Sequence, residues 1–284
     1  MVFLAGNGAF DALFSEGYLL KRCPEERKKE RMITMKTLQL LLTVSMGKRL
    51  IACGLMADQA VRESMTSGRL LIVAGTTDAR VAQEALRVVG SNVDLDPRFF
   101  RRGLTSAPGT KADGGQTSFD LLIDHGTART DRTVFDVAPE LTGDDIILKG
   151  ANAVYLPGKE AGVLIGHPQG GTMMPILSAA LGRRVQIIVP VGLEKRVDRP
   201  IRELVRIANN PEAEGCRMCP IPGRVFTELD AIRTLTGASA ELLAAGGVLG
   251  AEGAVYLAVT GNEDQLEAVR ALYRALRDEP PASL

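Results

Sequence analysis

The chain of 284 residues contains no tryptophan, only two histidines and few aromatic residues, which make up 4% of it. Any hydrophobic core must therefore be built mainly from aliphatic side chains. No segment reaches the roughly 20 consecutive apolar residues that a membrane-spanning helix needs. The sequence predicts a soluble protein with no membrane partner.

Neither sign of charge is in excess, since 34 Lys and Arg residues balance 34 Asp and Glu residues. A zero formal net charge argues against a general nucleic-acid-binding surface or a polycation that coats membranes. No nucleic-acid partner is therefore expected.

Cysteine is also scarce, with four residues: Cys23, Cys53, Cys216 and Cys219. No signal-peptide pattern precedes them, which favours a reduced, cytoplasmic setting over a disulfide scaffold. The Cys216-Arg-Met-Cys219 spacing is typical of metal or redox pairs, but a second pair is missing and neither histidine is close in sequence. We interpret this segment as a plain loop, and we expect no metal and no cofactor.

The pattern of apolar segments predicts an α/β protein with two domains and an N-terminal extension. Residues 1–31 are dense in charge and are interpreted as an extension, partly disordered. Residues 32–200 alternate strands and helices, which predicts a Rossmann-like three-layer domain with a parallel sheet. Residues 201–284 predict a smaller α/β, ferredoxin-like lobe, with a ligand between the two domains.

Two glycine-containing turns follow buried-type strands in the larger domain. The strand Arg69–Ala74 leads into Gly75-Thr76-Thr77 and a helical segment, and the turn Gly170-Gly171-Thr172 opens a helix predicted over Thr172–Leu181. Amides at a helix N-terminus bind anions, and turns at the carboxyl ends of parallel strands share one sheet edge. We therefore expect the amides after Ala74 and around Thr172 to form one anion site. The alternative is that these glycines only permit tight turns.

Further candidates lie near these turns, each with a structural alternative. His167 is the better acid or base candidate, because it lies in the predicted ligand loop, whereas His125 lacks a visible partner. Glu252, in a glycine-rich segment, belongs either to a lid or to a hairpin with an exposed carboxylate. The segment Phe99–Gly103 either clamps an anion with its arginines or pins a loop. Lys48, at a predicted helix over Gly47–Ser67, is interpreted as a solvated cation.

The turns resemble those of one known superfamily. Gly75-Thr76-Thr77 is similar to the first phosphate loop of ribose-5-phosphate isomerase, glucosamine-6-phosphate deaminase, the coenzyme A transferases and the sensor domains of DeoR-type repressors. The segment Leu148–Val154, with Gly150-Ala151-Asn152, resembles a further turn of that superfamily. The isomerases carry acidic residues there, whereas this chain has Asn152 and Ala153. The resemblance therefore implies a site for a phosphorylated or other anionic small molecule and does not fix a reaction.

The resulting hypothesis is a metabolic enzyme, an isomerase, hydrolase or transferase, that acts on a sugar phosphate, nucleotide or coenzyme A derivative. The alternative is a non-catalytic sensor on the same fold, and in both cases a homo-oligomer is expected. The predicted catalytic residues are His167, Asn152 and Glu252. The predicted ligand-binding residues are Gly75, Thr76, Thr77, Lys149, Gly150, Gly170, Gly171, Thr172 and Lys195.

Overall fold

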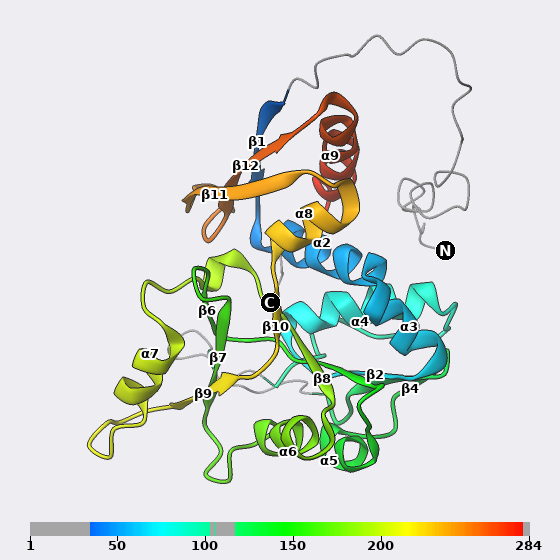
Figure 1. Ribbon diagram of the computed structural model, residues 1–284, viewed down its shortest axis with the longest axis vertical. Coiled ribbons are helices and arrows are strands. Elements are labelled where there is room, and N and C mark those ends of the chain that lie inside the picture. Colours follow the sequence, from blue (N-terminus) through cyan, green and yellow to red (C-terminus); the bar gives the residue numbers. More distant parts are fainter. Residues whose placement is uncertain (1–34, 103–104, 106–116, 281–284) are drawn as a thin grey trace.

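The computed structural model describes residues 35–102, 105 and 117–280, and the predicted extension 1–31 lies outside them. The strands of the described part form one six-stranded sheet and two three-stranded sheets, in a mixed α/β arrangement (Figure 1). None of the helices in this part is long and apolar enough to cross a membrane.

The six-stranded sheet has the order β10-β8-β5-β2-β3-β4. Its first four strands are parallel: β10 (Arg224–Phe226), β8 (Gln186–Pro190), β5 (Ile146–Leu148) and β2 (Arg69–Ile72). Beside β2, strand β3 (Leu121–Asp124) runs antiparallel to it, and the edge strand β4 (Thr127–Arg129) runs antiparallel to β3. The prediction of a parallel sheet is therefore corrected to a mixed one. A two-residue turn with positive φ at His125 and Gly126 then reverses the chain between β3 and β4.

Helices cover both faces of this sheet (Figure 1). Leu70 and Ile72 of β2 belong to one apolar cluster, together with α2 (Val44–Ala57) and α4 (Thr76–Val88). Leu71 lies in a second cluster with α5 (Val134–Val137), the 3-10 helix η1 (Ala138–Glu140) and α6 (Met173–Arg183). This division follows from the strand period of two, which sends successive side chains to opposite faces.

The C-terminal sheet has the order β1-β12-β11 and is antiparallel. It consists of β1 (Lys36–Leu42), β12 (Val255–Gly261) and β11 (Ser239–Ala245), and it packs against α8 (Glu228–Thr236) and α9 (Glu263–Leu276). Helices α8 and α9 each begin with a capping box, at Thr227 and at Asn262. The sheets cross the predicted boundary at residue 200, since β1 pairs with β12 and β10 joins the central sheet.

The third sheet is antiparallel, with the order β6-β7-β9. It contains β6 (Ala153–Tyr155), β7 (Glu160–Ile165) and β9 (Arg217–Ile221), and α7 (Ile201–Ala208) packs on it. Strand β9 overlaps the Cys216–Cys219 segment, which was interpreted as a plain loop. Its pairing with β7, more than fifty residues earlier in the chain, explains why local sequence did not reveal it.

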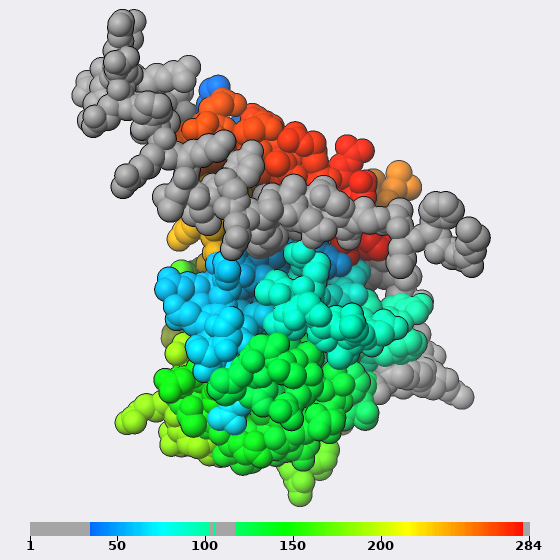
Figure 2. Space-filling view, turned by 90° about the vertical axis from the view of Figure 1, so that its right-hand side faces the viewer, coloured from blue at the N-terminus to red at the C-terminus, as the bar shows by residue number. Residues whose placement is uncertain are grey.

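The helix predicted over Gly47–Ser67 is divided in two. It consists of α2 and α3 (Gln59–Ser67), because the Asp58 carboxylate accepts a hydrogen bond from the Val61 amide and begins a new helix. Figure 2 shows the segment α2–α4, coloured blue to cyan, between the orange and red C-terminal part and the green central part. Helix α2 thus packs against both α4 and α8.

Candidate functional site

Charged and hydroxyl side chains gather where the four parallel strands end. A segment that carries such side chains follows each strand. These segments are Gly75–Asp78 after β2, Lys149 and Gly150 after β5, the 3-10 helix η2 (Leu193–Lys195) after β8, and Glu228 after β10. Hydrogen bonds and electrostatic interactions connect these segments. We call this group the edge cluster: Lys48, Thr76, Thr77, Asp78, Lys149, Glu194, Lys195 and Glu228.

Asp78 occupies the centre of the edge cluster, in the first turn of α4, and it is fully buried. Its Oδ2 accepts a hydrogen bond of 3.1 Å from the Gly150 amide. A Cβ at Gly150 would lie 2.6 Å from this oxygen, and a Cβ at Gly75 would also collide with it. The two glycines are therefore needed for space, because they leave room for a carboxylate between the ends of β2 and β5.

Replacing Gly150 with alanine is expected to displace the Asp78 carboxylate and to lower the free energy of unfolding by about 1–3 kcal/mol, the usual cost of overpacking. Chemical denaturation of the variant measures this loss. Gly182→Ala is the matched control, since a Cβ there meets no atom within 4 Å. An equal response of the two variants would contradict the steric role assigned to Gly150.

Two buried polar atoms at this helix start receive no hydrogen bond from any other described residue: Asp78 Oδ1 and Thr77 Oγ1. Burial raises the pKa of Asp78 to about 6, and the charges of Lys149 and Lys195 oppose this rise. Leaving such atoms unpaired costs about 1–3 kcal/mol each. The fold therefore keeps hydrogen-bonding capacity at this position at the expense of stability.

Three lysines surround Asp78 and give the cluster its positive charge. Lys48 Nζ donates to Thr76 Oγ1 at 3.1 Å, and Lys195 Nζ donates to the Ala151 carbonyl at 2.9 Å. Burial, followed by the charge of Lys195, lowers the pKa of Lys48, and burial lowers the pKa of Lys149. All three lysines are partly exposed and Thr76 is exposed, so the cluster is open to solvent beside the start of α4.

Glu228 and Glu194 form the acidic part of the cluster. Glu228 is buried, and its two oxygens accept hydrogen bonds of 3.3 and 3.0 Å from the Leu193 amide. Burial raises the pKa of Glu228 to about 8, and the charge of Glu194 adds to the rise. At neutral pH Glu228 is therefore largely protonated and Asp78 largely ionised, which places a proton donor and a proton acceptor in one site.

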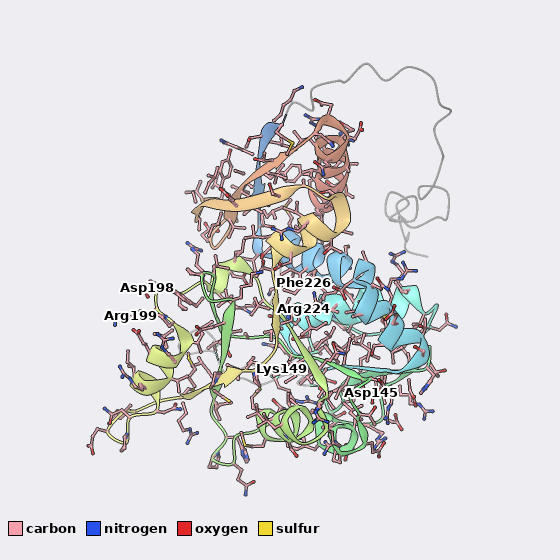
Figure 3. The ribbon with its side chains drawn as sticks, in the orientation of Figure 1. Asp145, Lys149, Asp198, Arg199, Arg224 and Phe226 are labelled. Atoms are coloured by element: carbon pink, nitrogen blue, oxygen red, sulfur yellow. The ribbon has the colours of Figure 1, made fainter. Side chains whose placement is uncertain are left out.

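Six of the predicted ligand residues lie in or beside the edge cluster: Gly75, Thr76, Thr77, Lys149, Gly150 and Lys195. They come together because the carboxyl ends of neighbouring parallel strands share one edge. Asp145 and Lys149 lie at the two ends of β5, and Lys149 is at the end nearer to Phe226 of β10 (Figure 3).

The second predicted turn lies elsewhere. The segment Gly170-Gly171-Thr172 opens α6, which packs on the opposite face of the central sheet from α4 (Figure 1). Both glycines have positive φ, 78° and 56°, so the tight-turn interpretation accounts for them. The expected cradle between the amides after Ala74 and those around Thr172 is therefore corrected, because the sheet separates the two turns.

The three predicted catalytic residues also lie apart from one another. His167 is exposed, accepts a hydrogen bond from the Gln169 amide, and lines a separate hollow of about 280 Å³ beside β9. Asn152 Oδ1 accepts from the Leu164 amide and so fixes the turn to β7. Glu252 is exposed in the β11–β12 connection, as its hairpin alternative stated.

The arginine segment and the cysteine pair have structural surroundings. Arg102 forms an ion pair with the buried Asp120, and Phe100 is buried while Phe99 is exposed, so the pinning interpretation accounts for Phe100. Gly103 lies outside the described residues. Cys216 and Cys219 are free thiols at β9. In the described ranges, no three His, Cys, Asp or Glu side chains gather as metal ligands would.

Sequence reasoning missed Asp78 and Glu228 and took Lys48 for a solvated cation. A signal for Asp78 was present, since Asp78, Val81, Ala82 and Ala85 are spaced on one helix face, and a carboxylate on an apolar face is unusual. Glu228 gave no such signal, because an acidic residue directly after an N-cap threonine is usually explained by its favourable interaction with the helix dipole. Comparison of the chain with protein-family models, with curated proteins and with solved structures gave no match.

Proposed function

We propose that the protein is an enzyme that binds a small anionic substrate at the edge cluster. This proposal is carried by two buried atoms at a helix start beside three lysines, Thr77 Oγ1 and Asp78 Oδ1, which have no hydrogen-bond partner in the described part of the chain. Unpaired buried polar groups lower stability, so their presence in a charged, partly open site favours a ligand that pairs with them.

The anionic part of the substrate is assigned to the start of α4. Gly75 provides no side-chain cap for the amides of Thr76 and Thr77, and Lys48 lies against Thr76. Amides at a helix N-terminus and a lysine ammonium are typical partners of phosphate and carboxylate groups. A phosphate ester or a small carboxylic acid therefore fits this end of the site.

The reacting part is assigned to the carboxyl groups. Asp78 and Glu228 have pKa values raised to about 6 and about 8 by burial, so they differ in protonation at neutral pH. Such a pair supports proton transfer, in which Asp78 accepts and Glu228 donates. Asn152 cannot transfer a proton, and these two acids would do so in its place. The proposed substrate class is still the one that the resemblance to the sugar-phosphate isomerases implies, but proton transfer is assigned to other residues.

The test is a binding screen followed by turnover. We expect phosphate esters or small carboxylates to raise the melting temperature, since a ligand that binds only the folded state stabilises it. Thr77→Val should weaken binding by about tenfold, a loss of about 1.4 kcal/mol. The unliganded variant should be as stable as the wild type or more stable, because valine has a similar size to threonine and lacks the hydroxyl that has no partner among the described residues.

The matched control is Lys159→Met, which changes an exposed lysine outside the cluster, compared with Lys48→Met within it. Only the Lys48 variant should lose anion affinity. Binding that survives both Thr77→Val and Lys48→Met would contradict the assigned site. Binding without any turnover of the ligand would favour the sensor alternative over an enzyme.

A further inference from the structure

Lys149 differs from the other two lysines of the edge cluster in its side-chain contacts. Its backbone amide donates to the Ile188 carbonyl at 3.1 Å, which holds the residue at the end of β5. Within the described residues its ammonium forms no hydrogen bond and no ion pair, although it is only partly exposed. Lys48 and Lys195, in contrast, donate to Thr76 and Ala151.

The surroundings of Lys149 favour the neutral amine. Burial is the largest cause that lowers its pKa, and the charge of Lys195 acts in the same direction, while Asp78 and Asp120 oppose them. A lysine that is desolvated beside another cation is an activated nucleophile. Asp78 is the acid whose charge acts most strongly on Lys149, and Asp78 Oδ1 has no hydrogen-bond partner among the described residues.

Resting on the proposed function, we propose that Lys149 forms an imine with the carbonyl carbon of an anionic aldehyde or ketone bound at the edge cluster. The amine nitrogen attacks the carbonyl carbon, and a C–N bond forms. Asp78 takes the two protons of that nitrogen one after the other and passes each to the former carbonyl oxygen, whose bond to the carbon then breaks. This oxygen leaves as water, so the step releases one water molecule and needs no oxidant or reductant.

The position of the anion fixes the class of substrate. Lys48, Thr76 and Thr77 lie at the start of α4, and Asp78 lies between that helix start and the end of β5. A compound that reaches both ends carries its phosphate or carboxylate a few bonds from its carbonyl group. Short sugar phosphates and 2-oxo acids share this chemistry.

The test is reductive trapping on the full-length protein. Glyceraldehyde 3-phosphate or pyruvate is added with sodium borohydride, which reduces an imine to a stable amine, and the modified lysine is located by mass spectrometry of peptides. We expect Lys149 to be modified at least about tenfold more than the exposed Lys159, as an activated amine should be. The two compounds distinguish a phosphate from a carboxylate ligand.

Matched compounds without a carbonyl group separate this inference from the proposed function. Glycerol 3-phosphate and lactate should protect Lys149 from trapping, which shows anion binding without imine formation. If they bind and the carbonyl compounds leave Lys149 unmodified, the imine is refuted while anion binding stands. If neither kind of compound binds and labelling is spread over surface lysines, both proposals fail. Trapping at Lys195 instead would overturn the assignment to Lys149.

Discussion

Replacing Glu228 with glutamine is expected to raise the free energy of unfolding by on the order of 4 kcal/mol at about pH 9, and to change it little at about pH 4. The reason is that burial raises the pKa of this carboxyl from 4.5 to about 8 in the folded protein. Glutamine keeps the shape of the neutral acid and can still accept from the Leu193 amide, but it cannot ionise.

The sign follows from proton binding. Between pH 4.5 and about 8 the folded state holds a proton on Glu228 that the unfolded state has lost. The stability of the wild type therefore falls as pH rises through this window, and the glutamine variant lacks this part of the decline. Asp78, with a pKa raised from 3.8 to about 6, contributes a decline of the same sign at lower pH.

Urea denaturation at several pH values measures the difference between wild type and variant. Glu252→Gln is the matched control, since Glu252 is exposed, and it should show no dependence on pH beyond that of the wild type. A difference between Glu228→Gln and wild type that is the same at all pH values would exclude a buried, proton-holding Glu228.

Replacing Asp120 with alanine is expected to lower the free energy of unfolding by about 3–5 kcal/mol, the usual cost of removing one partner of a buried ion pair. Asp120 is buried, and its carboxylate accepts hydrogen bonds of 2.8 Å from the Ala74 amide and 2.7 Å from the Val134 amide. It also pairs with Arg102. Alanine leaves two buried amides and a partly buried guanidinium without partners.

Because Ala74 directly precedes Gly75, the same change should also weaken anion binding at the edge cluster. Urea denaturation and ligand titration measure the two effects. Asp120→Asn retains one acceptor oxygen and should lose less stability than Asp120→Ala, and the exposed Asp131→Ala should lose almost none. The opposite order for the two Asp120 variants would argue against the hydrogen-bonding role of the carboxylate.

The elements with local signals were predictable from sequence, and those set by distant partners were not. Helix α9 shows its cap and its apolar face within fifteen residues, and β12 precedes it as a short apolar segment. Strand β9 pairs with β7, and β1 pairs with β12, and neither pairing was visible from local sequence. For the same reason the boundary at residue 200 does not follow the sheets.

The residues of the turns that form the site were predicted from sequence, whereas its two buried acids were not. Glycine and threonine after β2, and Lys149 and Gly150 after β5, carry a recognisable pattern, because turns at strand ends have a restricted composition. The carboxyl groups become informative only through burial, which raises the pKa of Asp78 and of Glu228. Burial depends on tertiary packing, and Gly170-Gly171-Thr172 shows that a similar turn can lie on the other face.

The pairing of β1 with β12 has a consequence for how the protein folds during synthesis. Lys36 lies opposite Gly261 in that ladder, so among the described residues β1 has no strand partner until β12, more than two hundred residues later, has left the ribosome. Contacts between such distant segments form slowly, because a long loop must close first. Until then β1 lacks its partner strand, so the nascent chain should depend on chaperones until β12 is available.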